Sequence, residues 1–246
     1  MADLLEVQGT DTAAVLVPAS LAGPVWVIAP HPDDESLGCG GLLAELAELG
    51  TPTWALLLTD GGASHPASVD WPRERLVLQR CAEWHAGLDL LGVHPDRRVA
   101  LNLPDGRLPF PRQEGGSAAA AAIRSALALA VPATVLLPWR RDPHPDHRAA
   151  HALISLALEE WSAVRRLEYT VWLPERAESR DLPQLNEASV WSADVRRHAA
   201  RKEAAIRCHA SQLGGLIHDD PTGFVLHEDM IRRAVGGPET LLEVKL

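Results

Sequence analysis

Five consecutive apolar residues, Val25–Ala29, end abruptly at a histidine that is followed closely by three acids. The run is rich in β-branched side chains, and a proline stands on each side of the histidine, which is typical of a buried strand that stops at a turn. The polar residues that follow such a strand in the sequence lie close together at its end. His31 and Asp34 are three residues apart, so both can converge on one cation while Asp33 points elsewhere. The pattern predicts half of a metal site.

Further apolar runs alternate with stretches rich in Ala, Leu, Glu and Arg, which is the composition of helices. We expect strands at Val25–Ala29, Trp54–Thr59, Arg98–Leu103, Thr134–Leu137 and Leu167–Leu173. We expect helices at Leu37–Leu49, Glu74–Leu91, Ala118–Ala130, His147–Trp161 and Ala193–Ser211. This alternation predicts an α/β fold, a Rossmann-like three-layer α/β/α arrangement with a mostly parallel sheet. The glycine-rich residues 38–41 predict that the first helix packs closely on the sheet.

The length suits one large domain or two small ones. One domain over residues 1–246 is expected, because no internal repeat is present and the only shift in composition is one polar connection. The core is expected at about residues 24–214, with the N-terminal segment and the C-terminal tail peripheral. The polar connection Pro174–Ser189 is expected to be a loop near the site. Pocket walls are expected from this connection and from Ser64–Trp71 and Leu108–Ser117.

The composition argues against several classes of partner. The formal net charge of −10 argues against a general basic field, so we expect no nucleic acid partner. The 3 cysteines are scattered without a CxxC pair, which favours a reducing compartment and hence the cytoplasm. Met1–Leu5 contains no basic residue, and no apolar run approaches the roughly 20 residues needed to cross a bilayer. We therefore expect neither export nor membrane insertion.

A second cluster of histidines and acids, Arg140–His147, also stands between an expected strand and an expected helix. Ligands of open parallel sheets bind beyond the carboxyl ends of the strands, so the two clusters are expected to face each other. His31, Asp34 and His147 then form a mixed set that leaves coordination positions open, as in a catalytic zinc site. Iron(II) or another divalent transition metal suits the same set.

These residues suit hydrolysis assisted by a metal. A metal so held lowers the pKa of bound water to about 7 and polarises a carbonyl oxygen. Asp33 lies next to the ligands without being needed as one, so we expect it to be the general base. His144, if protonated, is expected to stabilise the developing oxyanion. Asp146 is expected to orient His144 and to favour its charged form.

Each cluster alone has a simpler interpretation, because acids at the start of a helix also cap it and offset its dipole. Asp34 and Glu35 open such a helix. The presence of two clusters at equivalent strand ends favours the metal site over this interpretation.

The segments Pro30–Gly38 and His144–His147 resemble the two signature motifs of the PIG-L/LmbE-like metal-dependent deacetylases. The resemblance implies the LmbE-like deacetylase fold and hydrolysis of the N-acetyl group of N-acetylglucosamine-type sugars and related amides. The residues that would carry the family's functions are His31, Asp34 and His147 for zinc, Asp33 for the base, and His144 with Asp146 for the transition state.

Other parts of the chain also resemble family elements. Arg80 and Glu83 match an Arg-x-x-Glu helix, and Leu103–Gly106 matches a loop after a strand. By that match, Arg80 and Asp105 are expected to contact substrate hydroxyls.

The sequence departs from the family pattern at Asp142, where some sugar deacetylases carry an aromatic residue with a hydroxyl. The only tyrosine of the chain is Tyr169, so no tyrosine of that loop is expected to act. The sequence assigns no role to Asp142 or to Glu35.

The favoured hypothesis is a zinc-dependent hydrolase that removes an N-acyl group, expected to be acetyl, from an N-acetylglucosamine-type sugar or a sugar-bearing metabolite. A metal-dependent hydrolase of another amide or of a phosphoester is the second hypothesis. A non-catalytic α/β ligand-binding domain is the third. The expected partner is a small N-acylated molecule, and self-association into a homo-oligomer is left open.

Overall fold

The computed structural model describes residues 13–245. The strands are β1 (Ala14–Val15), β2 (Val25–Ala29), β3 (Thr53–Thr59), β4 (Arg98–Leu103), β5 (Thr134–Pro138), β6 (Arg165–Tyr169), β7 (Ala188–Ala193) and β8 (Glu239–Val244). The α-helices are α2 (Asp34–Glu48), α3 (Arg73–Leu91), α4 (Gly116–Leu127), α5 (Pro145–Ala157), α6 (Leu173–Arg176), α7 (Ala199–Arg207) and α8 (Glu228–Val235). Short 3-10 turns are η1 (Pro18–Ser20), η2 (Pro95–Arg97), η3 (Arg196–His198) and η4 (Ala210–Gln212).

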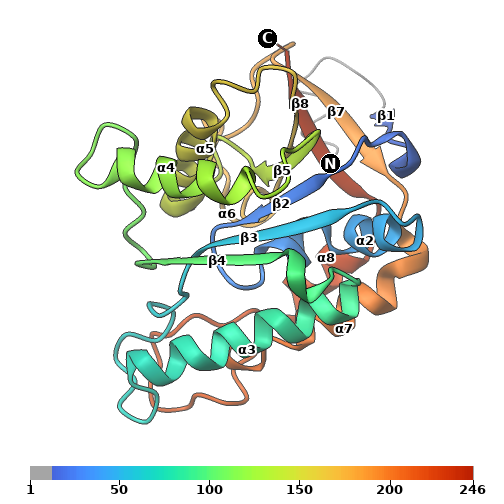
Figure 1. Cartoon of the computed structure of the whole chain (residues 1–246). Coiled ribbons are helices and arrows are strands. Elements are labelled where there is room, and N and C mark those ends of the chain that lie inside the picture. The colour runs from blue at the N-terminus through green and yellow to red at the C-terminus, as the bar shows by residue number, and fades with distance from the viewer. Residues whose placement is uncertain (1–12, 246) are drawn as a thin grey trace.

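The strands form one sheet of 8 strands in the order β1-β7-β8-β6-β5-β2-β3-β4 (Figure 1). All neighbours are parallel except β8, which runs antiparallel to both β6 and β7. The expected α/β fold with a mostly parallel sheet is therefore confirmed. Because β2 and β5 are parallel neighbours, their carboxyl ends lie at the same edge of the sheet.

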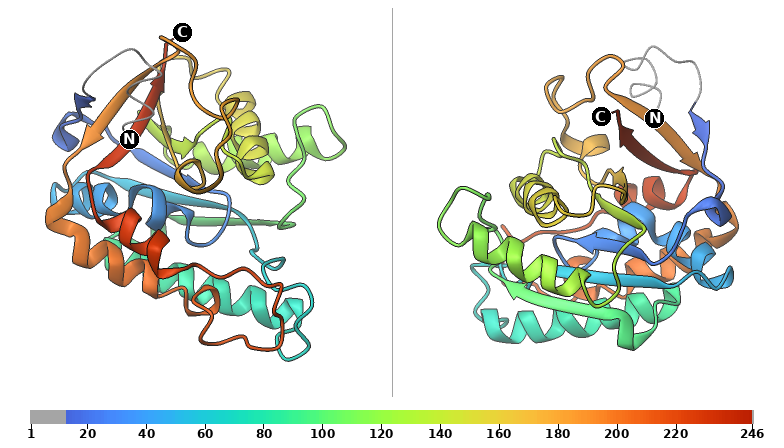
Figure 2. Two further views of the ribbon diagram at one scale, coloured as in Figure 1. Left: turned by 180° about the vertical axis from the view of Figure 1, so that it is seen from behind. Right: turned by 45° about the horizontal axis from the view of Figure 1, so that its top comes forward.

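Strand β2 is buried on both faces, as its continuous apolar sequence predicts. Val25, Val27 and Ala29 face one core cluster, and Trp26 and Ile28 face the other. Helices α2, α3 and α7 cover one face of the sheet, and α4 and α5 cover the other (Figure 2). The first cluster includes residues of the former helices and the second cluster residues of the latter. The three layers thus follow from the alternation of side chains along the central strands.

Four of the five expected strands match the structure to within one residue at each end. The fifth, Leu167–Leu173, ends at Tyr169, because Leu173 already begins α6 and Pro174 stands in its first turn. The last expected helix begins at Ala199 and not at Ala193, since residues 188–193 form β7.

The C-terminal segment was expected at the periphery, and the structure corrects this for β8. This strand lies between β6 and β7, and Leu241 and Leu242 are fully buried. Its pairing partners precede it by about 50 residues or more in the chain. A local sequence pattern therefore does not predict that β8 pairs with β6 and β7. Residues 1–12, with the expected absence of an export signal at Met1–Leu5, lie outside the described residues.

No helix within residues 13–245 is long and apolar enough to cross a membrane. The cytoplasmic location and the single domain stay predictions.

The glycine cluster of α2 brings this helix close to β6, as the sequence predicts. A Cβ atom at Gly38 would lie 2.3 Å from Cδ2 of Tyr169, whose hydroxyl donates a hydrogen bond of 2.7 Å to the carbonyl of Ile28. The ring cannot move away without breaking this buried bond. The contact sets the distance between α2 and the sheet, and therefore the position of Asp34 at the start of α2.

We expect Gly38→Ala to lower the free energy of unfolding by about 1–3 kcal/mol, because the added methyl group overpacks the interface with Tyr169. Urea unfolding followed by circular dichroism measures this loss. The matched control is Gly215→Ala, where an added Cβ meets no atom within 4 Å. Equal stability of the two variants would show that the contact between Gly38 and Tyr169 does not require glycine at this position.

Candidate metal centre

The two clusters expected from the sequence meet at the carboxyl ends of β2 and β5. His31 follows β2, and His144 and His147 stand at the start of α5, which follows β5. The ring centroids of His31 and His144 are 4.7 Å apart, those of His31 and His147 are 5.4 Å apart, and those of His144 and His147 are 5.1 Å apart. Three imidazoles from two separate segments therefore surround one point.

The carboxylate of Asp34 lies between two of these rings. Its Oδ2 atom is 3.1 Å from Nδ1 of His31 and 3.1 Å from Nε2 of His147, and it accepts a hydrogen bond of 2.8 Å from the backbone N–H of His31. All three predicted metal ligands are thus in contact through one oxygen. His144 also offers a ring nitrogen within 4.8 Å of ligand atoms on His31 and His147.

The bonding of His147 tests whether this group fits a metal. The ring is fully buried, and neither of its nitrogens makes a hydrogen bond of acceptable geometry. A buried polar group without a partner is costly. Two imidazoles and a carboxylate are the donor set of catalytic zinc sites, and a cation held by them would replace the poorly aligned contact between Nε2 of His147 and Oδ2 of Asp34. The residues present therefore fit a divalent metal.

The protonation of the ligands follows from their mutual contact. Burial alone would raise the pKa of Asp34, but the charges and contacts of His147 and His31 outweigh burial and hold this pKa well below its usual range. Burial alone would lower the pKa of His147, but Asp34 and Asp142 outweigh it and raise the pKa to about 9. A metal that binds here displaces a proton from the imidazole.

Each ligand histidine also has a carboxylate next to its other ring nitrogen. Nε2 of His31 lies 3.2 Å from Oδ2 of Asp146 and 3.2 Å from Oδ1 of Asp105, and Nδ1 of His147 lies 3.3 Å from Oδ1 of Asp142. Such carboxylates fix the orientation and tautomer of metal-binding imidazoles. Asp105, expected at the substrate, is thus also in contact with a metal-site histidine.

The structure gives Asp142 the role that the sequence leaves unassigned. Its carboxylate is fully buried; besides the contact with His147, Oδ1 accepts from the backbone N–H of His144 at 3.0 Å and Oδ2 from that of Trp172 at 3.1 Å. The side chain of Asp142 therefore contacts the predicted ligand His147 and also holds the backbone of His144 and of Trp172, which line the cleft. An acid two residues before His144 is visible in the sequence, but the fold of the loop decides what it touches.

Asp33 occupies a strained position just before α2. Its φ of 131° lies in the left-handed half of conformational space, which non-glycine residues rarely adopt. Its Oδ2 atom lies 3.2 Å from Nη2 of Arg80. Burial raises the pKa of Asp33 to about 7, although the charge of Arg80 lowers it. A carboxylate with this pKa can accept and return a proton near neutral pH.

Arg80, expected to contact substrate, is almost entirely buried beside Asp33. It donates hydrogen bonds to the carbonyls of Pro32 at 2.8 Å and Gly61 at 3.0 Å. Arg80 therefore also holds the turn that carries Asp33.

His144 differs from the expectation of a charged ring. Burial, and the charges of His31 and His147, lower the pKa of His144 to about 4, so the ring is neutral at neutral pH. Its Nδ1 atom accepts a hydrogen bond of 3.2 Å from the backbone N–H of Asp146, which leaves the ring proton on Nε2. A neutral imidazole with this tautomer still donates a hydrogen bond. The carboxylate of Asp146 contacts His31 and accepts from the N–H groups of Gly106 and Leu108.

Glu35 and Tyr169 lie behind the site. Glu35 is fully buried, accepts a hydrogen bond of 2.8 Å from Ser36, and has its pKa raised by burial to about 8, so it is uncharged at neutral pH. The Tyr169 hydroxyl is engaged by Ile28, as described above.

A cleft of about 790 Å³ opens over the histidines. Asp33, Arg80, Asp105 and His144 line it together with Trp172. Two of the three expected wall segments contribute, through Ser64, Pro66, Glu175 and Arg176, whereas Leu108–Ser117 does not. The wall formed by residues 222–233 was not expected from the sequence, because the C-terminal segment carries no metal-type motif.

The structure is an α/β fold in which the ends of the central strands carry a buried cluster of histidines and carboxylates with the donors that a divalent metal requires. Residues 26–158 match the PIG-L family, described as GlcNAc-PI de-N-acetylase, and the chain belongs to this family. It is 33% identical over 133 residues to the diacetylchitobiose deacetylase of Thermococcus kodakarensis, a match that covers 51% of this chain and 45% of that protein. The chain thus spans less than half the length of this relative.

Two further likenesses extend over most of the chain. The 1D-myo-inositol 2-acetamido-2-deoxy-alpha-D-glucopyranoside deacetylase of Mycobacteroides abscessus is 27% identical over 239 residues, covering 82% of this chain and 85% of that protein. The structure of N,N'-diacetylchitobiose deacetylase from Pyrococcus horikoshii superimposes with a TM-score of 0.65 and 22% identity, covering 99% and 91% of the two chains. The structural likeness supports the expected LmbE-like fold.

We expect Asp142→Asn to weaken zinc binding about 10- to 100-fold, because the amide no longer favours the proton on Nδ1 of His147. Competition with a chromogenic chelator measures the affinity. Asp96→Asn, at an exposed acid of η2, is the matched control and should bind zinc as the wild type does. An unchanged affinity in a stably folded Asp142→Asn protein would show that the carboxylate does not orient the ligand.

Proposed function

We propose that this protein is a zinc-dependent N-deacetylase that acts on an N-acetylglucosamine-type sugar or a sugar-bearing metabolite. The observation that carries the proposal is the carboxylate of Asp34 between His31 and His147, at the base of an open cleft. The family relatives named above are deacetylases of N-acetylated sugars, which supports the same class of reaction. Two imidazoles and a carboxylate with open positions suit a hydrolytic zinc site, and the same donor set also accepts iron(II).

In this proposal His31, Asp34 and His147 hold the cation. A divalent cation at such a site lowers the pKa of water bound to it to about 7 and polarises a carbonyl oxygen. Asp33 takes up the proton of the attacking water, since its pKa of about 7 lets it serve as a base at neutral pH. The same carboxyl then returns the proton to the leaving amine.

His144 stabilises the oxyanion as a neutral hydrogen-bond donor. The backbone N–H of Asp146 occupies Nδ1, so Nε2 carries the proton that faces a substrate. A neutral donor also avoids placing a third positive charge beside the metal and Arg80. Asp105 and Arg80 line the same cleft and are proposed to contact sugar hydroxyls. On the pattern of its cysteines, we propose that this single-domain enzyme works in the cytoplasm.

We expect Asp33→Asn to lower kcat about 100- to 10,000-fold while the zinc content stays that of the wild type, because the amide cannot accept the proton. Release of acetate from a panel of N-acetylated sugars measures kcat, and elemental analysis measures zinc. Asp96→Asn again serves as the control and should keep full activity. Near-normal turnover by Asp33→Asn would remove the base from the proposal, and the absence of stoichiometric metal in wild-type protein purified without chelator would favour the non-catalytic alternative.

The pH dependence of kcat/KM should show an acid limb near pH 7, since protonation of Asp33 removes the base. The charge of Arg80 lowers the pKa of Asp33, so Arg80→Met should move the limb to higher pH. Arg73→Met removes a charge from the same helix without touching Asp33 and should leave the limb in place. A pH profile that stays flat into strongly acidic solution would contradict this role for Asp33.

A further inference from the structure

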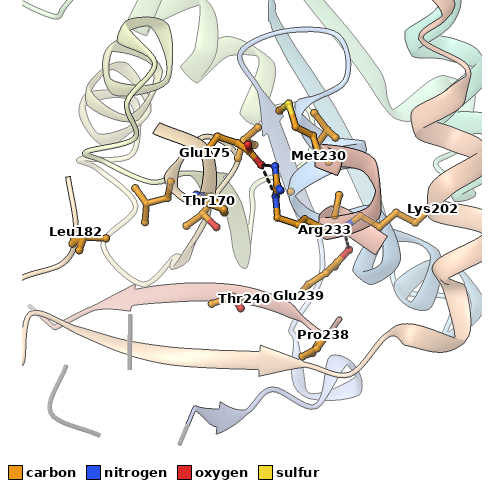
Figure 3. A pocket seen from close by; sticks show the side chains of 15 residues that line it. Thr170, Glu175, Leu182, Lys202, Met230, Arg233, Pro238, Glu239 and Thr240 are labelled. Carbon is orange, nitrogen blue, oxygen red and sulfur yellow. Dashed lines mark hydrogen bonds and ion pairs between the residues drawn. The ribbon is translucent and has the colours of Figure 1, made fainter. Parts of the chain in front are cut away.

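A second cavity, of about 320 Å³, shares several lining residues with the metal cleft. Figure 3 shows the side chains that line this second cavity. We call it the side chamber. Its walls come from the end of β6, from α6 and the loop after it, from α8, and from the start of β8. Its main apolar side chains are Val171, Leu173, Leu182, Met230, Ala234 and Pro238.

The side chamber and the cleft are neighbours. Leu37, Glu175, Met230 and Arg233 line both cavities. Leu37 is one helical turn beyond Asp34 on α2. Nε of Arg233 donates to Oε1 of Glu175 at 2.7 Å, and this partly exposed ion pair stands at the boundary between the two cavities. A substrate group that extends from the metal site past this pair enters the side chamber.

The charges of the side chamber restrict what it can bind. Its lining has four charged side chains, and each is paired with another of the four: Glu175 with Arg233, and Lys202 with Glu239 at 2.7 Å (Figure 3). The Glu239 carboxylate also accepts from the backbone N–H groups of Gly41 and Leu42. A charged ligand would therefore find no free counter-charge in this lining. Apart from Gly38, Thr170 and Thr240, the uncharged lining residues are apolar, which suits an uncharged apolar group.

The order of the strands places the side chamber on one particular side of the metal centre. The candidate sugar contacts, Asp105 and Arg80, belong to the side of β3 and β4, whereas the side chamber lies at the end of β6 and the start of β8. The metal centre stands between them at β2 and β5. The acyl carbon and the amine nitrogen of an amide carry their substituents in opposite directions. A sugar at Asp105 thus directs its acyl substituent toward the side chamber.

We propose that the side chamber receives the acyl chain of the substrate, so that sugars with N-acyl chains longer than acetyl are preferred. This inference rests on the proposed function. In the reaction the amide C–N bond breaks, the oxygen of water joins the acyl carbon, and a fatty carboxylate and a free amino sugar leave. Each methylene buried in an apolar site contributes about 0.8 kcal/mol, or about fourfold in affinity.

The first experiment compares N-acetyl-, N-butanoyl- and N-hexanoylglucosamine as substrates of the zinc-loaded enzyme. We expect kcat/KM to rise about tenfold or more from acetyl to hexanoyl, chiefly through a lower KM. A value that stays constant or falls with chain length would overturn the proposal.

The second experiment fills the side chamber with Ala234→Leu, at a half-buried position that lines this cavity and not the cleft. The ratio of kcat/KM for hexanoyl over acetyl should fall about tenfold toward one. Ala118→Leu, on the exposed surface of α4, is the matched control and should keep the ratio of the wild type. If the hexanoyl-over-acetyl ratio of kcat/KM is the same in both variants, the acyl chain of the substrate does not bind in the side chamber.

Calorimetric binding of the same compounds to metal-free protein separates this inference from the proposed function. Tighter binding of the hexanoyl compound, lost in Ala234→Leu, would support the side chamber even if no compound is hydrolysed. Hydrolysis of N-acetylglucosamine with no increase in kcat/KM for longer acyl chains would agree with the deacetylase proposal and would contradict binding of the acyl chain in the side chamber.

Discussion

The candidate metal centre depends on one carboxylate held between two imidazoles. Asp34 begins α2 after β2, and His147 lies in the first turn of α5 after β5. These residues are far apart in the chain, and only the parallel pairing of β2 with β5 brings them together. The close packing of Gly38 against Tyr169 then sets how far α2 stands above the sheet. The position of the Asp34 carboxylate is thus a property of the whole central layer.

Around this contact, each buried charge is compensated by another. Asp142 faces His147, and Asp105 and Asp146 face His31, so the outer nitrogen of each ring has an acid beside it. The result is a set of ionisable groups with divergent proton affinities. His144 is neutral at neutral pH, whereas burial brings the pKa of Asp33 to about 7. Separation of this kind is what a site needs in order to hold a metal and move a proton at one pH.

The C-terminal segment supplies walls for the two cavities at the carboxyl ends of the central strands. Residues 222–233 form a wall of the cleft, and β8 inserts beside β6 to form part of the side chamber. The salt bridge between Glu175 and Arg233 lies where the two cavities adjoin. The central strands thus determine the chemistry, and the late elements determine the space that a substrate can occupy.

Local patterns in the sequence sufficed for the central strands, the layers and the six candidate residues at the ends of two strands, because hydrophobic periodicity and strand-end motifs are local properties. Arg80 and Asp105 were added by the family likeness alone. The family likeness then followed from two short motifs. The partner of Asp142, the neutral state of His144, the place of β8 and the shape of both cavities became visible in the folded chain alone. Those features depend on burial and on contacts between segments distant in the chain, and a local pattern does not encode which distant group will lie 3 Å away.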